Sequence, residues 1–259
     1  MTITCRAVTA CLCALLLGAS GCRLVTNSRM GMQIKVNKYF DEDGHTYPEL
    51  DDAIFRLKMR VSGVLTPQKF VKEVGVWIFL TAPHDPAKMP ILLVHGHWSG
   101  PPVFKELAES IDTSKYELWY TYYPAGLDIN ETVAMFQINL ARLANYYHTD
   151  EVIVLAYSMG GPVARQTIAT ADPSLKLPVV PLFIGVANSW DGSMKTNAGA
   201  KTAITADPEK AASYGAESWK QVYAGAPFVR GMFRHPLPQE TEFHMIYSFG
   251  GDDPKIPGR

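Results

Sequence analysis

The stretch that decides the fold of this chain is Ala156-Tyr157-Ser158-Met159-Gly160-Gly161. The apolar residues 152–155 directly precede it and predict a buried strand, and a helix-like segment directly follows it. Small residues at positions 156 and 160 let the backbones of strand and helix pass close together at a tight turn. The pattern predicts that the Ser158 hydroxyl stands exposed at the edge of a sheet. An ordinary strand–turn–helix connection that happens to contain a serine is the alternative interpretation.

A second motif stands upstream, where the predicted strand 90–94 runs into His95-Gly96-His97-Trp98-Ser99-Gly100-Pro101. Acyl transfer needs two backbone N–H groups directed at the developing oxyanion. With Ser158 as the attacking nucleophile, one N–H belongs to the residue after it, Met159. The other belongs to the loop after an earlier strand, where His97 is the natural candidate. His95 and His97 do not predict a metal site, because catalytic zinc normally has three protein ligands and no third ligand stands nearby in the sequence.

Composition and charge place the chain among ordinary globular proteins. It has 259 residues, 47% of them hydrophobic and 19% charged, with a formal net charge of −1. This length fits one good-sized domain, which we expect over residues 31–259. A net charge near zero, without a basic stripe, gives no electrostatic reason to expect nucleic-acid binding.

The first residues have the features of a targeting segment rather than of a folded domain. An apolar run from Cys11 to Gly18 is too short for a comfortable transmembrane helix, and it leads into Ala19-Ser20-Gly21-Cys22. These four residues resemble the lipobox of bacterial lipoproteins, in which the cysteine is lipidated and becomes the new N-terminus. All four cysteines lie at or before Cys22, so a disulfide framework is excluded in the mature chain.

The lipobox resemblance implies a signal peptide over residues 1–21, a tether over 22–30 and a lipid anchor on Cys22. Arg23 follows the cysteine. In lipoproteins of diderm bacteria, a residue other than Asp at that place usually directs the protein to the outer membrane. We therefore expect a protein of the bacterial cell envelope, anchored to the outer membrane and facing the periplasm or the surface. A plain secretory peptide and an uncleaved anchor are the alternatives.

Apolar periodicity along the rest of the chain predicts strands that alternate with helices. Strands are expected over residues 74–80, 90–94, 117–122, 152–155, 179–187 and 243–249. Amphipathic helices are expected over 50–61 and 104–111, and a long helix capped by Asn130 is expected to reach Tyr147. Alternating strands and helices predict a parallel sheet of the doubly wound kind.

Four motifs taken together resemble lipase-like α/β-hydrolases: residues 88–96, residues 122–126, residues 156–161, and Asn188-Ser189-Trp190-Asp191-Gly192. The similarity is closest to bacterial lipoprotein members related to triacylglycerol lipases and inositol-deacylase-like hydrolases. It implies an α/β-hydrolase fold with a mostly parallel sheet, helices on both faces and a small cap insertion over about 189–239. It also implies ester hydrolysis by a Ser158 nucleophile without any cofactor.

The same resemblance implies a catalytic acid that holds the base in the right orientation. Asp253 lies on the loop after the predicted strand 243–249, next to Pro254, as in many family members, and is the expected acid. Asp252 on the same loop and Asp191 after the preceding strand are the alternatives.

The histidine of the expected triad does not stand where the family places it. Only His235 and His244 follow Ser158, the first within the expected cap and the second within a predicted strand. We expect truncation, so that the chain lacks the last strand and helix of the fold, or else a displaced histidine. The predicted function is a serine esterase or lipase acting on acyl esters, or acyl transfer by the same residues. The alternative is a truncated or inactive envelope lipoprotein that binds a lipid or a partner.

Overall fold

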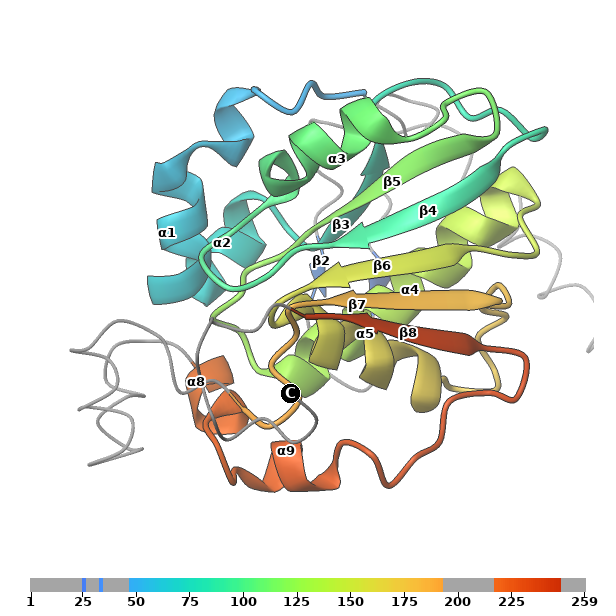
Figure 1. Cartoon of the computed structure of the whole chain (residues 1–259). Coiled ribbons are helices and arrows are strands. Elements are labelled where there is room, and N and C mark those ends of the chain that lie inside the picture. The colour runs from blue at the N-terminus through green and yellow to red at the C-terminus, as the bar shows by residue number, and fades with distance from the viewer. Residues whose placement is uncertain (1–24, 27–32, 35–46, 193–216, 248–259) are drawn as a thin grey trace, which may run out of the picture.

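A mostly parallel sheet forms the centre of the molecule (Figure 1). The computed structural model describes residues 25–26, 33–34, 47–192 and 217–247. Within them the strands of this sheet are β3 (Trp77–Leu80), β4 (Met89–Val94), β5 (Tyr116–Tyr122), β6 (Ile153–Tyr157), β7 (Leu182–Val186) and β8 (Glu242–Ile246). Their order is β3-β5-β4-β6-β7-β8, with β3 antiparallel to β5 and every other pair parallel.

Helices cover both faces of this sheet, which confirms the expected α/β class (Figure 1). The first face carries η1 (Ala53–Phe55), α1 (Leu57–Leu65), α2 (Pro67–Glu73), η2 (Pro101–Phe104) and α3 (Lys105–Ser110). The second face carries α4 (Ile129–Tyr147) and α5 (Gly160–Ala169). Successive residues of a strand point to opposite faces, so Ile91 and Leu93 pack on the first side and Leu92 and Val94 on the second.

The chain leaves the sheet between β7 and β8, within the segment where a cap is expected. The described part of this excursion contains α8 (Glu217–Val222) and α9 (Pro227–Gly231), and residues 193–216 lie outside the described residues. Trp219 and Val222 of α8 are buried in the same cluster as α4 and α5. This part of the chain therefore packs onto the body of the domain.

Only short pieces of the N-terminal segment belong to the described residues. β1 (Val25–Thr26) pairs antiparallel with β2 (Gln33–Ile34), while the expected signal peptide and Cys22 lie outside the described ranges. Among the described residues, none of the helices combines the length and the apolar character needed to cross a membrane.

Two helix predictions differ from the structure in detail. The helix expected over 50–61 is broken at Arg56, whose extended backbone separates η1 from α1. The cap of α4 is Asp128 rather than Asn130, because the Asp128 carboxylate accepts hydrogen bonds from the backbone N–H groups of Asn130 and Glu131. The apolar spacing therefore located these helices correctly, but the extended backbone of Arg56 and the carboxylate of Asp128 set where α1 and α4 begin.

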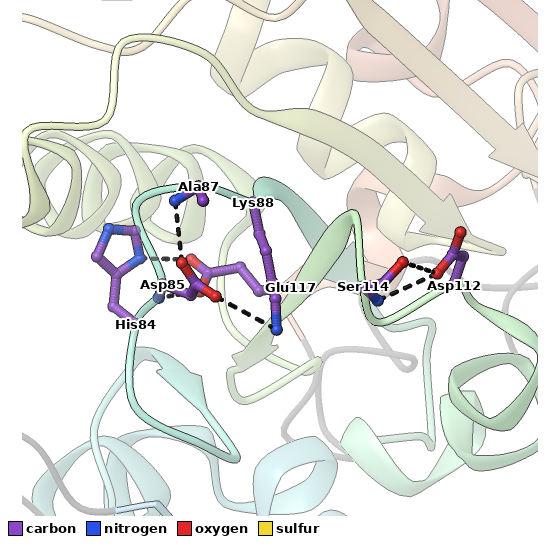
Figure 2. A network of polar contacts seen from close by, with 7 residues as sticks. All are labelled: His84, Asp85, Ala87, Lys88, Asp112, Ser114 and Glu117. Atoms are coloured by element: carbon purple, nitrogen blue, oxygen red, sulfur yellow. Dashed lines mark hydrogen bonds and ion pairs between the residues drawn. The ribbon is translucent and has the colours of Figure 1, made fainter.

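A carboxylate organises the end of the sheet where the parallel strands begin (Figure 2). Oε1 of Glu117, at the start of β5, accepts hydrogen bonds from His84 Nδ1 and Trp119 Nε1, each at 2.7 Å. Its Oε2 accepts the backbone N–H of Asp85 at 3.0 Å. Asp85 also forms an ion pair with Lys88 at 3.5 Å. The loop before β4 is thereby attached to β5, at the end opposite the serine motif.

Candidate active site

Ser158 stands on the turn between β6 and α5, as the sequence predicts. It has a φ of 54°, a left-handed conformation that is rare for a residue with a side chain. The turn is closed on both sides: the Ser158 N–H donates to the carbonyl of Val186 at 2.9 Å, and its carbonyl accepts from Gly161 at 3.1 Å. No hydrogen-bond partner of the Ser158 hydroxyl is found among the described residues. The half-buried hydroxyl is therefore available at the carboxyl ends of the strands.

The loop after β4 approaches Ser158 so closely that a side chain is excluded. A Cβ at Gly96 would stand 2.7 Å from the Cβ of Ser158 and 3.2 Å from its Oγ. On the other side of the turn, a Cβ at Gly160 would stand 2.6 Å from the carbonyl oxygen of His95. These two glycines let β4, β6 and α5 converge, as the sequence interpretation requires.

Asn188 holds the turn from a third side, and the sequence analysis assigns it no role. Its Nδ2 donates to the carbonyls of Ala156 at 3.0 Å and Ser158 at 2.9 Å, so it spans the serine turn. The residue before it, Ala187, has a φ of 47°, and this reversal directs the chain back after β7. Asn188 opens one of the four family-like motifs, but only the fold shows what its amide binds.

Two backbone N–H groups beside Ser158 have no acceptor. The N–H of His97, in the loop after Gly96, donates no hydrogen bond among the described residues. The same holds for the N–H of Met159, a buried residue that precedes the first turn of α5. Both residues proposed from the sequence as oxyanion donors therefore have unpaired amides on the segments that converge at Ser158.

His95 is fully buried and uses both ring nitrogens in the fold. Its Nδ1 donates to the carbonyl of Gly96 at 2.9 Å, and its Nε2 accepts the backbone N–H of Tyr123 at 3.4 Å. The Tyr123 ring stacks on the imidazole with centroids 4.2 Å apart, and its hydroxyl donates to the His95 carbonyl. Burial lowers the pKa of His95 to about 4, so the ring is neutral and supports the loop without serving as a base.

His97 makes a different contact, with the excursion between β7 and β8. Its Nε2 accepts the indole N–H of Trp219 at 2.6 Å. Burial, together with the smaller effect of the nearby His95, lowers the pKa of His97 to about 3, so this imidazole is neutral as well. The lone pair of Nε2 is occupied by Trp219, which leaves His97 no free nitrogen lone pair with which to accept the Ser158 proton.

The structure does not bring His244 or His235 to Ser158. His244 lies in β8 level with Leu155, which places it about 10 Å back along the strands from Ser158 and two strands across. Its Nε2 contacts Glu242 Oε1 at 2.7 Å on an exposed surface. His235 follows α9, where its carbonyl accepts a hydrogen bond from Arg165, partway along α5.

The carboxylates considered from the sequence are either exposed or outside the described residues. Asp191 lies exposed in the turn after β7, four residues beyond Ala187. Asp252 and Asp253 fall outside the described residues, so the preferred acid stays a prediction. Within the described part of the chain, no three His, Cys, Asp or Glu side chains gather in a metal-binding arrangement.

Comparison with known proteins gives structural likenesses at low similarity. No protein-family model matches the chain, and no curated protein matches it significantly. The mature lipase BlEst2 of Bacillus licheniformis is 21% identical over 65% of this chain and 70% of its own, with a TM-score of 0.47. A putative esterase from Staphylococcus aureus is 17% identical over 66% of this chain and 60% of its own, with a TM-score of 0.45.

Aspergillus fumigatus lipase B is 17% identical over 60% of this chain and 36% of its own, with a TM-score of 0.42. The present chain thus spans only about a third of this enzyme and less than two thirds of the Staphylococcus protein. At this level of similarity, the function has to be argued from the geometry of the site itself.

Proposed function

We propose that this protein is a serine ester hydrolase in which Ser158 attacks acyl esters and the N–H groups of His97 and Met159 bind the oxyanion. The observation that carries the proposal is an unpaired hydroxyl and an unpaired amide on one strained turn, with a second unpaired amide on the loop that packs against it, all judged within the described residues. A left-handed residue with a side chain costs about 1 to 3 kcal/mol, and such strain concentrates at functional sites. An ordinary strand–helix connection does not need this arrangement.

In the proposed reaction, Oγ of Ser158 forms a bond to the carbonyl carbon of the ester, and the π electrons of the carbonyl move to its oxygen. The Oγ proton passes to a base that the described residues do not place beside Ser158. The tetrahedral intermediate then expels the alcohol, which takes up a proton, and leaves an acyl group on Ser158. Water attacks this acyl-enzyme by the same steps and releases the carboxylic acid product. Asp253 is the proposed triad carboxylate that orients the base.

The proposal is tested by labelling the purified full chain with a fluorophosphonate and by measuring turnover of a short-chain nitrophenyl ester. We expect the phosphonate on Ser158, and both labelling and turnover should disappear in Ser158→Ala. Ser174→Ala is the matched control, because Ser174 is an exposed serine whose hydroxyl is bound to Asp172. Ester binding without turnover, unchanged in Ser158→Ala, would instead support the binding lipoprotein.

We also propose that Cys22 carries a lipid that anchors the protein in the bacterial envelope. The support is the sequence Ala19-Ser20-Gly21-Cys22 after a short apolar run. Expression in a diderm bacterial host fed an alkyne fatty acid should give a labelled protein in the outer-membrane fraction. The Cys22→Ala variant should lose the label. The Cys13→Ala variant, which retains Cys22, should still carry it. A labelled Cys22→Ala protein would contradict the anchor.

A further inference from the structure

The imidazole of His97 is fixed in one tautomer by the residue that contacts it. An indole N–H can only donate, so Nε2 of His97 must be the acceptor in the 2.6 Å contact with Trp219. Because burial keeps the pKa of His97 far below its usual range, the ring is neutral at ordinary pH. A neutral imidazole whose Nε2 accepts a hydrogen bond carries its proton on Nδ1.

This Nδ1–H group is buried and has no acceptor within residues 47–192 and 217–247. A buried donor left unpaired costs about 1 to 3 kcal/mol, so an arrangement that creates one calls for an explanation. His95, two residues earlier on the same loop, shows the alternative, because both of its ring nitrogens are hydrogen-bonded. The loop can therefore satisfy a buried imidazole completely, and at His97 it does not.

The position of His97 suggests what the free donor is for. His97 directly follows Gly96, whose Cα lies against the Ser158 side chain. The imidazole clusters with two indoles, with ring centroids 5.4 Å from Trp98 and 5.6 Å from Trp219. The unpaired backbone N–H of the same residue is one of the two proposed oxyanion donors. Two unpaired donors thus belong to the residue that follows Gly96, the glycine packed against the Ser158 side chain.

We propose that the Nδ1–H of His97 is a third hydrogen-bond donor to the carbonyl oxygen of the ester held at Ser158, and that Trp219 keeps this proton on Nδ1. The inference rests on the proposed function for its substrate class. The proton stays on the imidazole throughout, so no bond breaks in this contact. His97 would be a catalytic residue through its side chain as well as its backbone, and Trp219 a positioning residue that acts through His97.

The tautomer is tested first, without substrate. Nitrogen NMR of the full chain carrying 15N-labelled histidine should show His97 protonated on Nδ1 only, from about pH 5 to about pH 8. In Trp219→Phe no indole N–H donates to Nε2, and the His97 nitrogen signals should move toward those of a mixture of the two tautomers. Trp190→Phe is the matched control, because the Trp190 indole makes ring contacts with Phe183 and Phe243 and no hydrogen bond to any residue that the structure describes. Protonation on Nε2 in the unmodified protein would overturn the proposal.

The contact with the ester is tested by infrared spectroscopy of a 13C-carbonyl nitrophenyl ester bound to the Ser158→Ala protein. Hydrogen bonds from the site should shift its carbonyl band to lower frequency than in the free ester. We expect His97→Phe and His97→Gln to lose part of this shift and His97→Asn to keep it. The Asn amide nitrogen replaces Nδ1 as a donor, whereas the Gln amide replaces only Nε2.

Kinetic measurements on variants that keep Ser158 distinguish a hydrogen bond from His97 to the substrate from a packing role of its ring. Removing one donor to an oxyanion lowers kcat on the order of 100-fold, and we expect His97→Phe to do so with little change in KM. The effect of Trp219→Phe should be smaller and should vanish in the His97→Phe background, because Trp219 acts through His97.

The outcomes separate this inference from the proposed function. An unchanged carbonyl band in all His97 variants, with Ser158 still labelled by the phosphonate, overturns the third donor and leaves the esterase standing. Failure of the ester to bind Ser158→Ala also overturns it, while the labelling result decides the esterase independently. Equal losses in His97→Asn and His97→Phe would mean that the ring only packs.

Discussion

The two ends of the sheet each contain buried polar side chains around a histidine, and they are satisfied in opposite ways. Where the parallel strands begin, Glu117 accepts hydrogen bonds from the side chains of His84 and Trp119 and from the backbone N–H of Asp85, so each of these three donors has an acceptor. Figure 2 shows Glu117 with His84 and Asp85. The atom left over in this cluster is the buried Nε2 of His84, which is an acceptor in the tautomer that carries its proton on Nδ1. Where the strands end, the leftover groups among the described residues are one acceptor, Oδ1 of Asn188, and three donors: the amides of Met159 and His97 and the Nδ1–H of His97.

This difference separates a structural cluster from a binding site. A carboxylate surrounded by donors is complete and stabilises the chain around it. Donors without an acceptor are complete only when an oxygen of a ligand arrives, and the developing oxyanion of an ester is such an oxygen. The comparison predicts that substitutions at the beginning of the strands change the free energy of unfolding, whereas those at the carboxyl end change turnover.

The largest expected effect is that of Gly96→Ala, at the carboxyl end. The new methyl group would stand 2.7 Å from the Cβ of Ser158, so the loop or the serine turn must move. Misplacement of about 1 Å costs on the order of 100-fold in rate, and we expect at least this loss of kcat in nitrophenyl ester hydrolysis. Gly231→Ala is the control, because its Cβ would meet nothing within 4 Å. Equal activity of the two variants would contradict the close approach at Ser158.

At the other end of the sheet, Glu117→Gln should lower the free energy of unfolding by about 2 to 3 kcal/mol, since a buried donor is left facing an amide N–H₂. The side chain keeps its size, but only one oxygen remains for the donors of His84, Trp119 and Asp85. Urea unfolding measures the loss, and kcat of the folded protein should be unchanged.

Glu73→Gln serves as the matched control for Glu117. Glu73 forms an exposed ion pair with Lys69 at 3.8 Å, and pairs of this kind contribute little to stability. If both glutamine variants unfolded at the same urea concentration as the unmodified protein, the Glu117 cluster would not have the structural role assigned to it.

Acid should act on the carboxyl end through its two buried histidines. The folded pKa of His95 is about 4, below its ordinary value of 6.5, so the unfolded chain binds a proton over this range and the folded chain does not. Stability is therefore fully present above about pH 6.5 and falls as the pH drops, by about 2 kcal/mol per such histidine at pH 5. His97 behaves in the same way. In His97→Asn the loss of unfolding free energy at acid pH should be about half that of the unmodified protein. Urea unfolding at about pH 5 and above about pH 6.5 measures this loss.

The sequence predicted the elements near Ser158 because the chemistry there is local. The residues 156–161 and the apolar run before them are consecutive, and the small residue expected at Gly160 for a close approach is where the structure shows one. The central strands are continuous apolar runs, which is typical of strands buried on both faces. Periodicity failed where one side chain decided the outcome, as at Asp128, whose carboxylate begins α4.

The contacts that distinguish the two ends of the sheet could not be predicted. His97 and Trp219 are far apart in the chain, and nothing in either neighbourhood indicates that the indole meets the imidazole. The same holds for His84 and Glu117, and for the Asn188 amide that spans the serine turn. Each contact depends on which strands become neighbours and in what register, and this is a property of the folded sheet.

The smallest expected effect is that of His244→Gln, a direct test of the displaced histidine. The strand register places His244 level with Leu155, on an exposed surface beside Glu242, and not at the edge where Ser158 stands. A base must come within hydrogen-bond reach of the proton that it removes. We therefore expect His244→Gln to leave ester turnover, its pH profile and the melting temperature unchanged. A loss of turnover comparable to that of Ser158→Ala would show that β8 moves to bring His244 to the serine, and the distinction between the two ends of the sheet would then no longer hold.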